Sequence, residues 1–463
     1  MNFNKITEAD IKSLIEILDS DRVTLKEDIS EDYSHDELAE LRVYPELIVE
    51  PENTEEVAQI MKFASKRNIP VTPRGSGTGL CGGAVAMEGG ILLLTTSMDE
   101  IIEIDEENLT ASVQPGVILM NFAEKVNDLG FMYPPDPGEK SATLGGNVLT
   151  NAGGMRAVKY GVTRDYVLGM EIVLPNGEII NTGGKVVKNS SGYSIQDLMI
   201  GSEGTLGIVT EITLKLVPMP KKALTLLIPF DSLEEAIGTV PEIINAKIVP
   251  TGIEFMEKEV LLAATDYLGK EFPDTSAPAY LLLKFDGNDK KEIEKQYEVA
   301  ADVCLANNAY DVYIANTDER QDVIWDTRGA LLEALKAVSE LDECDVVVPR
   351  NRVADFVNFT HRLEDKHNLR IRGFGHAGDG NLHLYTLKDD LDDQTWQQRN
   401  KAVMDELYAK SREMKGKVSG EHGIAIAKKE YLHEDIGPMQ LELMRGIKNT
   451  FDPQNILNPG KTV

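Results

Sequence analysis

The residues best suited to chemistry lie in two short motifs. Residues 373–383 read GFGHAGDGNLH and residues 419–423 read SGEHG, which brings into play His376, His383, Glu421 and His422. The Gly-Asp-Gly-Asn run between the first two histidines is typical of a tight turn, so we expect His376 and His383 on the two arms of a chain reversal. Two imidazoles and a carboxylate form a common ligand set for a divalent metal with open coordination positions.

A simpler interpretation of these motifs stays open. Asp379 and Asn381 could only shape the turn, with the histidines bound to backbone carbonyls and Glu421 an ordinary surface acid. The glycines on both sides of Glu421 and His422 indicate a constrained loop, which favours the metal site. Zn, Mn and Fe(II) all accept such ligands, so the sequence leaves the choice of metal open.

Glycine-rich loops form the second chemical feature. Residues 70–85 read PVTPRGSGTGLCGGAV, and residues 134–151 and 201–207 are also rich in glycine and small residues. Glycine lets backbone N–H groups approach a ligand closely, and such loops bind phosphate groups, here with Arg74 as a fixed positive charge. The alternative is a plain turn-rich connector. Several loops within one region favour a long, extended ligand over a mononucleotide.

The first loop also matches the GxGxxG fingerprint of dinucleotide-binding Rossmann units at residues 77–82. We reject that match because the fingerprint requires a helix directly after the glycines, and GAVAMEGG has no helical periodicity. Residues 373–378 match and fail in the same way, because the following NLHLYTL indicates a strand.

The elements that must position these motifs follow from periodicity. Apolar residues at helical spacing predict helices over 11–18, 53–67 and 439–451, and β-branched runs predict strands at 91–95, 111–113, 170–174 and 208–216. Prolines at 218 and 220 indicate a domain boundary. Beyond it, strands at 224–228, 280–285, 312–314 and 345–348 alternate with helices at 233–244, 291–306 and 353–367, which predicts an α+β layer domain.

Composition narrows the classes of function. The chain has 463 residues with 47 Lys plus Arg and 77 Asp plus Glu, a net charge of −30, which disfavours a nucleic-acid partner. Three cysteines cannot form a four-cysteine Fe–S cluster within this chain. The N-terminal residues lack a basic segment followed by an apolar run, and no apolar stretch is long enough to span a bilayer. We therefore expect a cytoplasmic protein without an integral membrane segment.

The series PRGSGTGLCGG, TLGGNVLTNAGG, GSEGTLGIVTEITL and DPQNILNPGK resembles the FAD-binding oxidoreductases of the vanillyl-alcohol-oxidase type. More narrowly, it is similar to the D-lactate dehydrogenase and glycolate oxidase flavin-subunit branch, over about residues 40 to 463. The resemblance implies an α+β fold with a two-part FAD-binding domain and an α+β substrate (cap) domain built on a mainly antiparallel sheet. The boundaries we expect are 1–218 for the FAD-binding domain, 219–420 for the cap domain, and 421–463 for a C-terminal segment that returns to the FAD-binding domain.

The resemblance also implies which residues line the cofactor. Some relatives tether FAD through a histidine in the first loop, but the matching residue is Thr78, so we expect non-covalent FAD. The residues placed along the cofactor are Arg74, Gly75, Ser76, Gly77, Thr78, Gly79, Leu80, Thr143, Gly146, Asn147, Gly153, Gly154, Glu203, Gly204, Gly207, Ile208 and Asn458.

In this branch the two histidines of the first motif and the glutamate of the second hold a divalent metal, which maps onto His376, His383 and Glu421. The next residue, His422, would act as general base. An arginine early in a helix binds the substrate carboxylate, which points to Arg328, because a guanidinium matches a carboxylate with two hydrogen bonds. The alternative for Arg328 is a surface helix arginine.

The implied activity is FAD- and metal-dependent oxidation of a D-2-hydroxy acid, D-lactate before others, to the 2-oxo acid. The electrons would pass to a separate carrier, for which an electron-transferring flavoprotein is favoured over an Fe–S subunit, a quinone or a cytochrome. Glu343 and Tyr385 stand where relatives specialised for dicarboxylates carry a lysine and a polar residue, which favours a small monocarboxylate. The alternatives are a glycolate oxidase flavin subunit, a D-2-hydroxyglutarate dehydrogenase, a non-redox transferase of the alkyl-glycerone-phosphate synthase type, or a non-catalytic flavin-binding scaffold.

Overall fold

The computed structural model describes residues 3–38 and 41–463, which divide into two compact units. The first unit comprises residues 1–153, 162–219 and 421–463, and the second comprises residues 154–161 and 220–420. The first unit is thus assembled from three separate stretches of chain, and its last stretch begins at Glu421. We describe each unit by itself.

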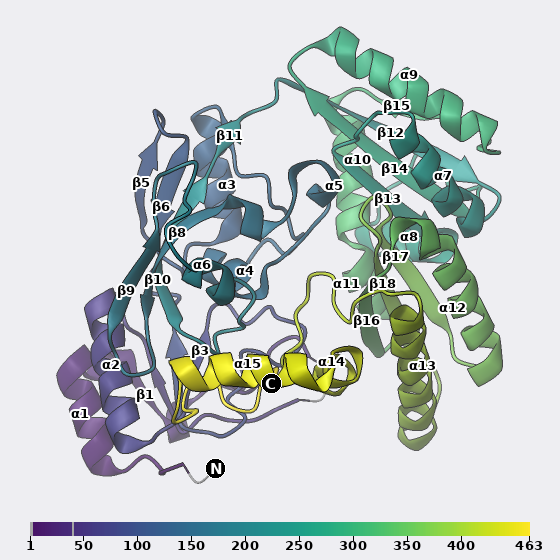
Figure 1. Ribbon diagram of the computed structural model, residues 1–463. Helices are drawn as coiled ribbons and strands as arrows, with labels where there is room; N and C mark the ends of the chain where they lie inside the picture. The colour runs from purple at the N-terminus through teal and green to yellow at the C-terminus, as the bar shows by residue number, and fades with distance from the viewer. Residues whose placement is uncertain (1–2, 39–40) are drawn as a thin grey trace. The chain divides into compact units, whose positions relative to one another are not determined.

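The first unit opens with a four-stranded sheet in the order β1-β2-β4-β3, in which β4 runs parallel to both of its neighbours. These strands are β1 (Val23–Leu25), β2 (Leu47–Val49), β3 (Val71–Arg74) and β4 (Ile91–Leu94). Two helices accompany them, α1 (Glu8–Leu18) and α2 (Thr54–Arg67), and pack against each other (Figure 1). The side chain of Asn53 accepts the N–H of Glu56 and caps α2. The apolar faces of these elements form one buried core.

A second sheet of the first unit is entirely antiparallel, in the order β5-β6-β10-β8-β9. Its strands are β5 (Ile101–Asp105), β6 (Thr110–Val113), β8 (Val167–Val173), β9 (Ile179–Gly183) and β10 (Ile208–Lys215). A short pair, β7 (Phe131–Met132) and β11 (Val217–Pro218), completes the strands. The helices here are α3 (Leu119–Asp128), α4 (Leu144–Thr150) and α6 (Ile195–Met199).

The C-terminal stretch adds α14 (Lys429–Asp435) and α15 (Pro438–Phe451) and then returns to the first sheet. Leu457 forms a parallel bridge with Val71 of β3, and Asn458 N–H donates to the Val71 carbonyl at 2.7 Å. Residues nearly 400 positions apart are therefore neighbours, as the yellow and purple segments of Figure 1 illustrate.

The second unit is built on one seven-stranded antiparallel sheet in the order β15-β12-β14-β13-β17-β18-β16. Its strands are β12 (Lys222–Phe230), β13 (Gly252–Glu257), β14 (Ala279–Gly287), β15 (Tyr313–Ala315), β16 (Leu341–Val347), β17 (Ile371–His376) and β18 (Asn381–Leu387). Its helices are α5 (Ala157–Tyr160), α7 (Leu233–Asn245), α8 (Lys258–Leu268), α9 (Lys290–Ala306), α10 (Asp318–Gly329), α11 (Leu331–Val338), α12 (Val353–His367) and α13 (Asp393–Glu413).

The two faces of this sheet differ in character. Alternate residues of a strand point to opposite faces, and directly paired residues share a face. Phe255, Leu382 and Leu384 point to one face, which is apolar. The other face carries the ionisable residues: Glu254 pairs with His376, Asp345 with His383, and Glu343 with Tyr385.

Candidate functional site

The first unit contains a pocket whose walls come from the glycine-rich loops. Its lining includes Arg74, Gly75, Ser76, Gly77, Thr78, Gly79, Leu80, Thr143, Gly146, Asn147, Gly153, Glu203, Gly204 and Ile208, together with Glu421 and His422. Fourteen of the residues that the resemblance assigns to the cofactor thus meet at one pocket. Gly154, Gly207 and Asn458 are not among the described residues that line it.

The pocket also has walls that sequence reasoning missed. They come mostly from small or apolar residues that carry no chemical signal of their own: Pro73, Cys81, Gly83, Ala84, Thr95, Pro115, Pro137, Glu139, Ala142, Gly145, Leu149, Thr150, Ala152 and Val209. Only their neighbourhood to the glycine-rich motifs in the sequence could have indicated them.

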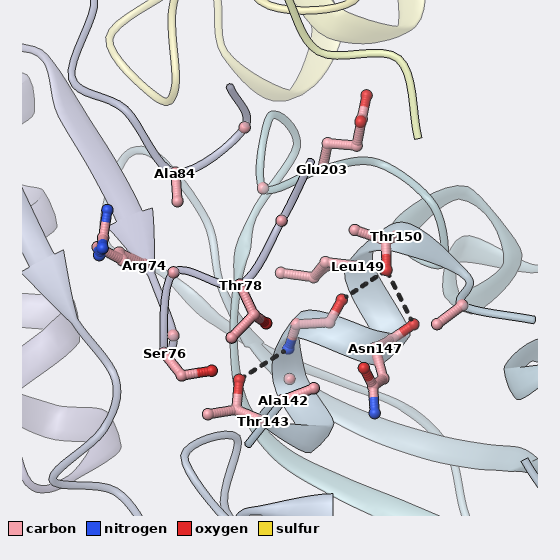
Figure 2. A pocket seen from close by; sticks show the side chains of 18 of the residues that line it. Arg74, Ser76, Thr78, Ala84, Ala142, Thr143, Asn147, Leu149, Thr150 and Glu203 are labelled. Atoms are coloured by element: carbon pink, nitrogen blue, oxygen red, sulfur yellow. Dashed lines mark hydrogen bonds between the residues drawn. The ribbon is translucent and has the colours of Figure 1, made fainter. Parts of the chain in front are cut away.

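The first turn of α4 faces the loop that follows β3. Thr143 caps this helix, its Oγ1 accepting the N–H of Gly146 at 3.2 Å. Figure 2 shows the Ser76 and Thr78 side chains directed toward Thr143, and dashed lines mark the Thr143 and Thr150 hydrogen bonds. No helix follows residues 77–82, where the chain forms turns and bends, so the rejection of a Rossmann unit is confirmed.

Glycines are required where the loop meets α4. A Cβ added at Gly75 would lie 2.3 Å from Thr143 Oγ1, and one at Gly145 would lie 2.6 Å from the Pro115 Cβ. Both distances are below van der Waals contact, so a side chain at either position displaces the wall of the pocket. The small residues therefore let two backbone segments approach each other beside the pocket.

The guanidinium of Arg74 binds a separate segment, residues 32–35. It donates to the carbonyls of His35 at 2.6 Å and Asp32 at 2.9 Å and lies over the Tyr33 ring. Figure 2 shows it pointing away from Ser76 and Thr78. The structure thus gives Arg74 a role in shaping the loop, which sequence reasoning did not anticipate.

Glu203 holds the loop that carries Glu421 and His422. Its carboxylate accepts the N–H of Ile424 at 2.8 Å, the N–H of Ala425 at 3.0 Å and the hydroxyl of Thr462 at 2.5 Å. Glu203 itself has φ 53°, a left-handed conformation that few non-glycine residues adopt. The geometry of the loop at the pocket thus depends on one carboxylate from the GSEGTLG motif.

Asn458 and Lys461 tie the C-terminal tail to the same place. Asn458 Nδ2 donates to the Glu203 carbonyl at 2.8 Å, and Lys461 Nζ donates to the Val85 carbonyl at 2.7 Å and to Asn458 Oδ1 at 2.8 Å. Burial lowers the pKa of Lys461 to about 8, against the opposing effect of the carboxylates of Asp36 and Glu203. Asn458 therefore supports the pocket through the backbone.

The second candidate region is the polar face of the sheet in the second unit. As predicted, His376 ends β17 and His383 lies in β18, on the two arms of a tight reversal. Their ring centroids are 5.1 Å apart and the rings are perpendicular. Both histidines are buried, and they share a face because His383 pairs with Phe374, two residues before His376.

A carboxylate lies behind His376. Glu254 is fully buried, and its two oxygens lie 2.7 Å and 2.9 Å from His376 Nδ1. It also accepts from Arg328, at 2.9 Å from Nε and 2.6 Å from Nη2. Burial raises the pKa of Glu254, but the charges of His376 and Arg328 and their hydrogen bonds outweigh burial, and the pKa lies below its ordinary value.

A second buried carboxylate, Asp345, lies opposite His383. It accepts Asn381 Nδ2 at 2.7 Å, the Ser419 hydroxyl at 2.7 Å and the Gly420 N–H at 3.1 Å. His383 Nδ1 is 3.7 Å from its Oδ1, beyond hydrogen-bond distance. Asp345 therefore fastens residues 419–420 to β16 and to β18, the strand that carries His383.

Aromatic side chains continue this face. Phe374 stacks on Tyr385 with centroids 5.1 Å apart, and the Arg328 guanidinium lies 4.8 Å from the Phe374 centroid. The Tyr385 hydroxyl donates to Glu343 Oε1 at 3.2 Å. Burial and the nearby Glu343 carboxylate raise the pKa of Tyr385, so this phenol stays protonated.

Arg328 lies in the last turn of α10, not early in its helix as the resemblance implies. Gly329 ends α10, and α11 begins at Leu331, so the run that reads as one helix in the sequence is two. Arg328 is only 6% exposed, which excludes the alternative of a surface helix arginine.

Comparisons with known proteins identify the family of the chain. Residues 45–183 match the family described as "FAD binding domain", and residues 219–462 match "FAD linked oxidases, C-terminal domain". The fold is similar to that of p-cresol methylhydroxylase with substrate bound, with a TM-score of 0.80 and 18% identity over 99% of this chain and 97% of that one. Fold and pocket together define a two-domain FAD-binding flavoprotein of the vanillyl-alcohol-oxidase type.

Two curated relatives narrow the class. The chain is 49% identical over 466 residues to the D-lactate dehydrogenase of Anaerostipes hadrus, covering 99% of this chain and 98% of that protein. It is 43% identical over 433 residues to glycolate oxidase subunit GlcD of Bacillus subtilis (strain 168), covering 93% and 91%. The chain therefore belongs to the FAD-linked oxidase family, and it is an FAD-dependent oxidoreductase of hydroxy acids. Within the described residues, no helix is both long and apolar enough to cross a membrane.

Proposed function

We propose that this protein oxidises D-lactate to pyruvate, with His422 as general base, Arg328 as the carboxylate-binding residue and a divalent metal held by His376, His383 and Glu421. The observation that carries the proposal is the buried polar face of the second unit, where two histidines, an arginine and two carboxylates converge on a sheet. Burial of ionisable groups costs free energy. Such groups are concentrated at functional sites, so their presence here supports a function.

The donor set fits a metal such as Zn, Mn or Fe(II). The perpendicular rings of His376 and His383 present nitrogens from adjacent strands, and the contact of His376 Nδ1 with Glu254 leaves Nε2 as the ligand atom. Glu421 follows Gly420, whose N–H is bonded to Asp345 opposite His383. When bound, the metal would supply positive charge that lowers the pKa of the 2-hydroxyl group.

The pocket of the first unit fits FAD bound without a covalent link. Its lining of glycines and hydroxyl side chains suits a long cofactor, and Thr78 stands where a histidine tether would be. When bound, FAD supplies the acceptor for the hydride that leaves the substrate Cα. Fourteen of the residues predicted for the cofactor would contribute directly to this pocket, and Asn458 would support it through the Glu203 carbonyl.

The protein's own residues would move the proton and fix the substrate. His422 lines the cofactor pocket and has an imidazole whose ordinary pKa, near 6.5, suits a base at neutral pH. It would take the hydroxyl proton as the C–H bond breaks toward the flavin. Arg328, with its guanidinium fixed by Glu254 and Phe374, would orient the carboxylate.

A small monocarboxylate suits this face better than a dicarboxylate. Glu343 and Tyr385 are joined by a hydrogen bond beside His383, and Glu343 would repel a second carboxylate. We therefore favour lactate over D-2-hydroxyglutarate, and keep glycolate as the nearest alternative because a GlcD subunit is among the relatives. We further propose a cytoplasmic location and transfer of electrons to a separate carrier, an electron-transferring flavoprotein or an Fe–S subunit.

The test is anaerobic mixing of the FAD-loaded, metal-replete protein with D-lactate, L-lactate, glycolate and D-2-hydroxyglutarate in turn, while the flavin absorbance is followed. We expect bleaching with D-lactate. Bleaching only with the dicarboxylate would contradict our interpretation of Glu343 and Tyr385, and bleaching only with glycolate would assign the protein to the glycolate oxidase subunits. If none of the four acids reduced the flavin, the dehydrogenase proposal would fall and a non-redox transferase or a flavin-binding scaffold would take its place.

A further inference from the structure

Glu254 occupies a position that is unusual for a carboxylate. It lies in the middle of β13, the central strand of the seven-stranded sheet, with none of its surface exposed. Its neighbours in the same strand, Ile253 and Phe255, point to the opposite, apolar face. Desolvation of a charge in such a place costs free energy, so the carboxylate must have charged or hydrogen-bonding partners that offset this cost.

The first partner is His376, the cross-strand neighbour of Glu254. Because both carboxylate oxygens lie within 2.9 Å of Nδ1, that nitrogen carries a proton in this arrangement, and the lone pair of the neutral ring is on Nε2. A carboxylate behind a metal-binding histidine fixes its tautomer and ring orientation and raises the basicity of the ligand nitrogen.

The second partner is Arg328, which reaches the same carboxylate from α10. Its Nε and Nη2 both donate to Glu254 Oε2, at 2.9 Å and 2.6 Å. Two hydrogen bonds to one oxygen hold the guanidinium plane, which also lies over the Phe374 ring. The guanidinium N–H groups that do not bind Glu254 are therefore held in a fixed orientation, in which they could bind a substrate carboxylate.

Stability alone is a weak explanation for this network. Replacement of buried ion pairs by well-packed apolar residues is often neutral or stabilising, and the face already contains apolar residues such as Met256 and Phe374. The Glu254 carboxylate contacts both the proposed metal ligand, His376, and the proposed substrate ligand, Arg328. A role in orienting these two side chains for the reaction explains its burial better than stability does.

We propose that Glu254 is a positioning residue that sets the tautomer of His376 and the orientation of Arg328 together. The proposal rests on the proposed function, because it assumes that His376 binds a metal and Arg328 a carboxylate. It predicts that loss of the negative charge at residue 254 weakens both metal binding and substrate binding, although residue 254 itself touches neither.

The test uses the full-length protein loaded with FAD and freed of metal by a chelator. Zn²⁺ and Mn²⁺ are titrated separately in competition with a chromophoric chelator, for the wild type, Glu254→Gln and Glu254→Asp. Glu257→Gln is the matched control, because Glu257 is a partly buried glutamate of the same strand, points to the opposite face and accepts the Gly373 N–H. FAD content and thermal unfolding are measured for each variant.

We expect Glu254→Gln to weaken metal binding by about 10- to 100-fold, the usual range for loss of a carboxylate behind a histidine ligand. The KM for D-lactate should rise as well, while Glu257→Gln binds metal like the wild type. Glu254→Asp keeps the charge but withdraws it by about 1.5 Å, so its affinity should fall between the two. This variant decides the question if Glu254→Gln does not fold.

Wild-type metal affinity in both Glu254 variants would overturn the inference and leave the proposed function intact. An equal loss in Glu257→Gln would also overturn it, because the effect would then report general loosening of the sheet. Failure of the wild type itself to bind either metal would contradict the proposed metal site, and Glu254 would lose its assigned role with it.

Discussion

The two candidate sites, one in each unit, are built in different ways. The pocket of the first unit is made of loops, where glycines and short side chains let backbone segments approach each other and few charges face inward. The polar face of the second unit is made of regular strands, where charged side chains are fixed by cross-strand pairing. A cofactor that stays bound needs a shaped surface, whereas a substrate that must react needs charges at fixed positions. Substitutions that change shape and substitutions that change charge should therefore have different effects in the two units.

The largest effect on the reaction rate should come from His422, which lines the pocket of the first unit and is the proposed general base. We expect His422→Gln to slow flavin reduction by D-lactate by about 10²- to 10⁴-fold, because a general base contributes that much, while FAD content stays unchanged. Stopped-flow absorbance measures the rate. His433→Gln, in α14 of the same unit, is the control, since His433 Nε2 bonds to the Thr462 carbonyl and His433 is not among the described residues that line the pocket. Reduction at the wild-type rate in His422→Gln would exclude it as the base.

The next effect tests the charge-built face. Asp345→Asn replaces one of the two acceptor oxygens by an NH2 donor, which faces either Asn381 Nδ2 at the Oδ1 position or the Ser419 hydroxyl and Gly420 N–H at the Oδ2 position. We expect the free energy of unfolding to fall by about 3 kcal/mol, because hydrogen bonds to a buried charge are lost and a donor faces donors. Denaturant unfolding followed by circular dichroism gives the value. A change below about 0.5 kcal/mol, the scale of surface substitutions, would mean that Asp345 does not hold this segment.

Glu257 offers a pH test on the apolar face of the same sheet. Burial raises its pKa from 4.5 to about 7, although Arg372 and the Gly373 N–H oppose the shift. Because the folded protein binds this proton more tightly than the unfolded chain, the stabilisation is complete below pH 4.5 and is lost as the pH rises through about 7. The stability of the wild type relative to Glu257→Gln should therefore fall by roughly 2–3 kcal/mol between these pH values. If the free energies of unfolding of the two proteins changed with pH in the same way, the raised pKa of Glu257 would be contradicted.

The smallest effect tests shape in the loop-built pocket. We expect Gly75→Ala to weaken FAD binding about tenfold, because its Cβ would displace the Thr143 hydroxyl that caps α4 and such overpacking costs roughly 1–3 kcal/mol. Gly446→Ala in α15 of the same unit is the control, since an added Cβ there would have no atom of the described residues within 4 Å. FAD release measured by fluorescence compares the two. Equal affinities would show that close approach at Gly75 is not required.

The sequence predicted much of this arrangement, for physical reasons that differ between the units. The prediction that His376 and His383 lie on two strands joined by a turn is confirmed, because the sequence Gly-Asp-Gly-Asn between them strongly favours a tight turn. The glycine-rich loops correctly indicated a pocket without a Rossmann helix. Both are local signals, carried by residues that are close in the chain.

What the sequence did not reveal depends on long-range pairing. Glu254 and Asp345 have no motif around them, and their importance appears only when β13 pairs with β17 and β16 with β18. The supporting roles of Arg74 and Asn458 were missed because their partners are mainly backbone carbonyls of other segments, which carry no residue-specific signal. The break between α10 and α11 at Gly329 was missed because helical periodicity continues across it.

The most direct test of the central claim separates the two sites by removing the metal. Protein treated with a chelator and freed of it should keep its FAD, lose flavin reduction by D-lactate under anaerobic conditions, and regain it on addition of Zn²⁺, Mn²⁺ or Fe²⁺. That result would show a cofactor pocket that depends on shape alone and a reactive face that depends on charge. Reduction of the flavin by D-lactate at an undiminished rate in the metal-free protein would contradict the account.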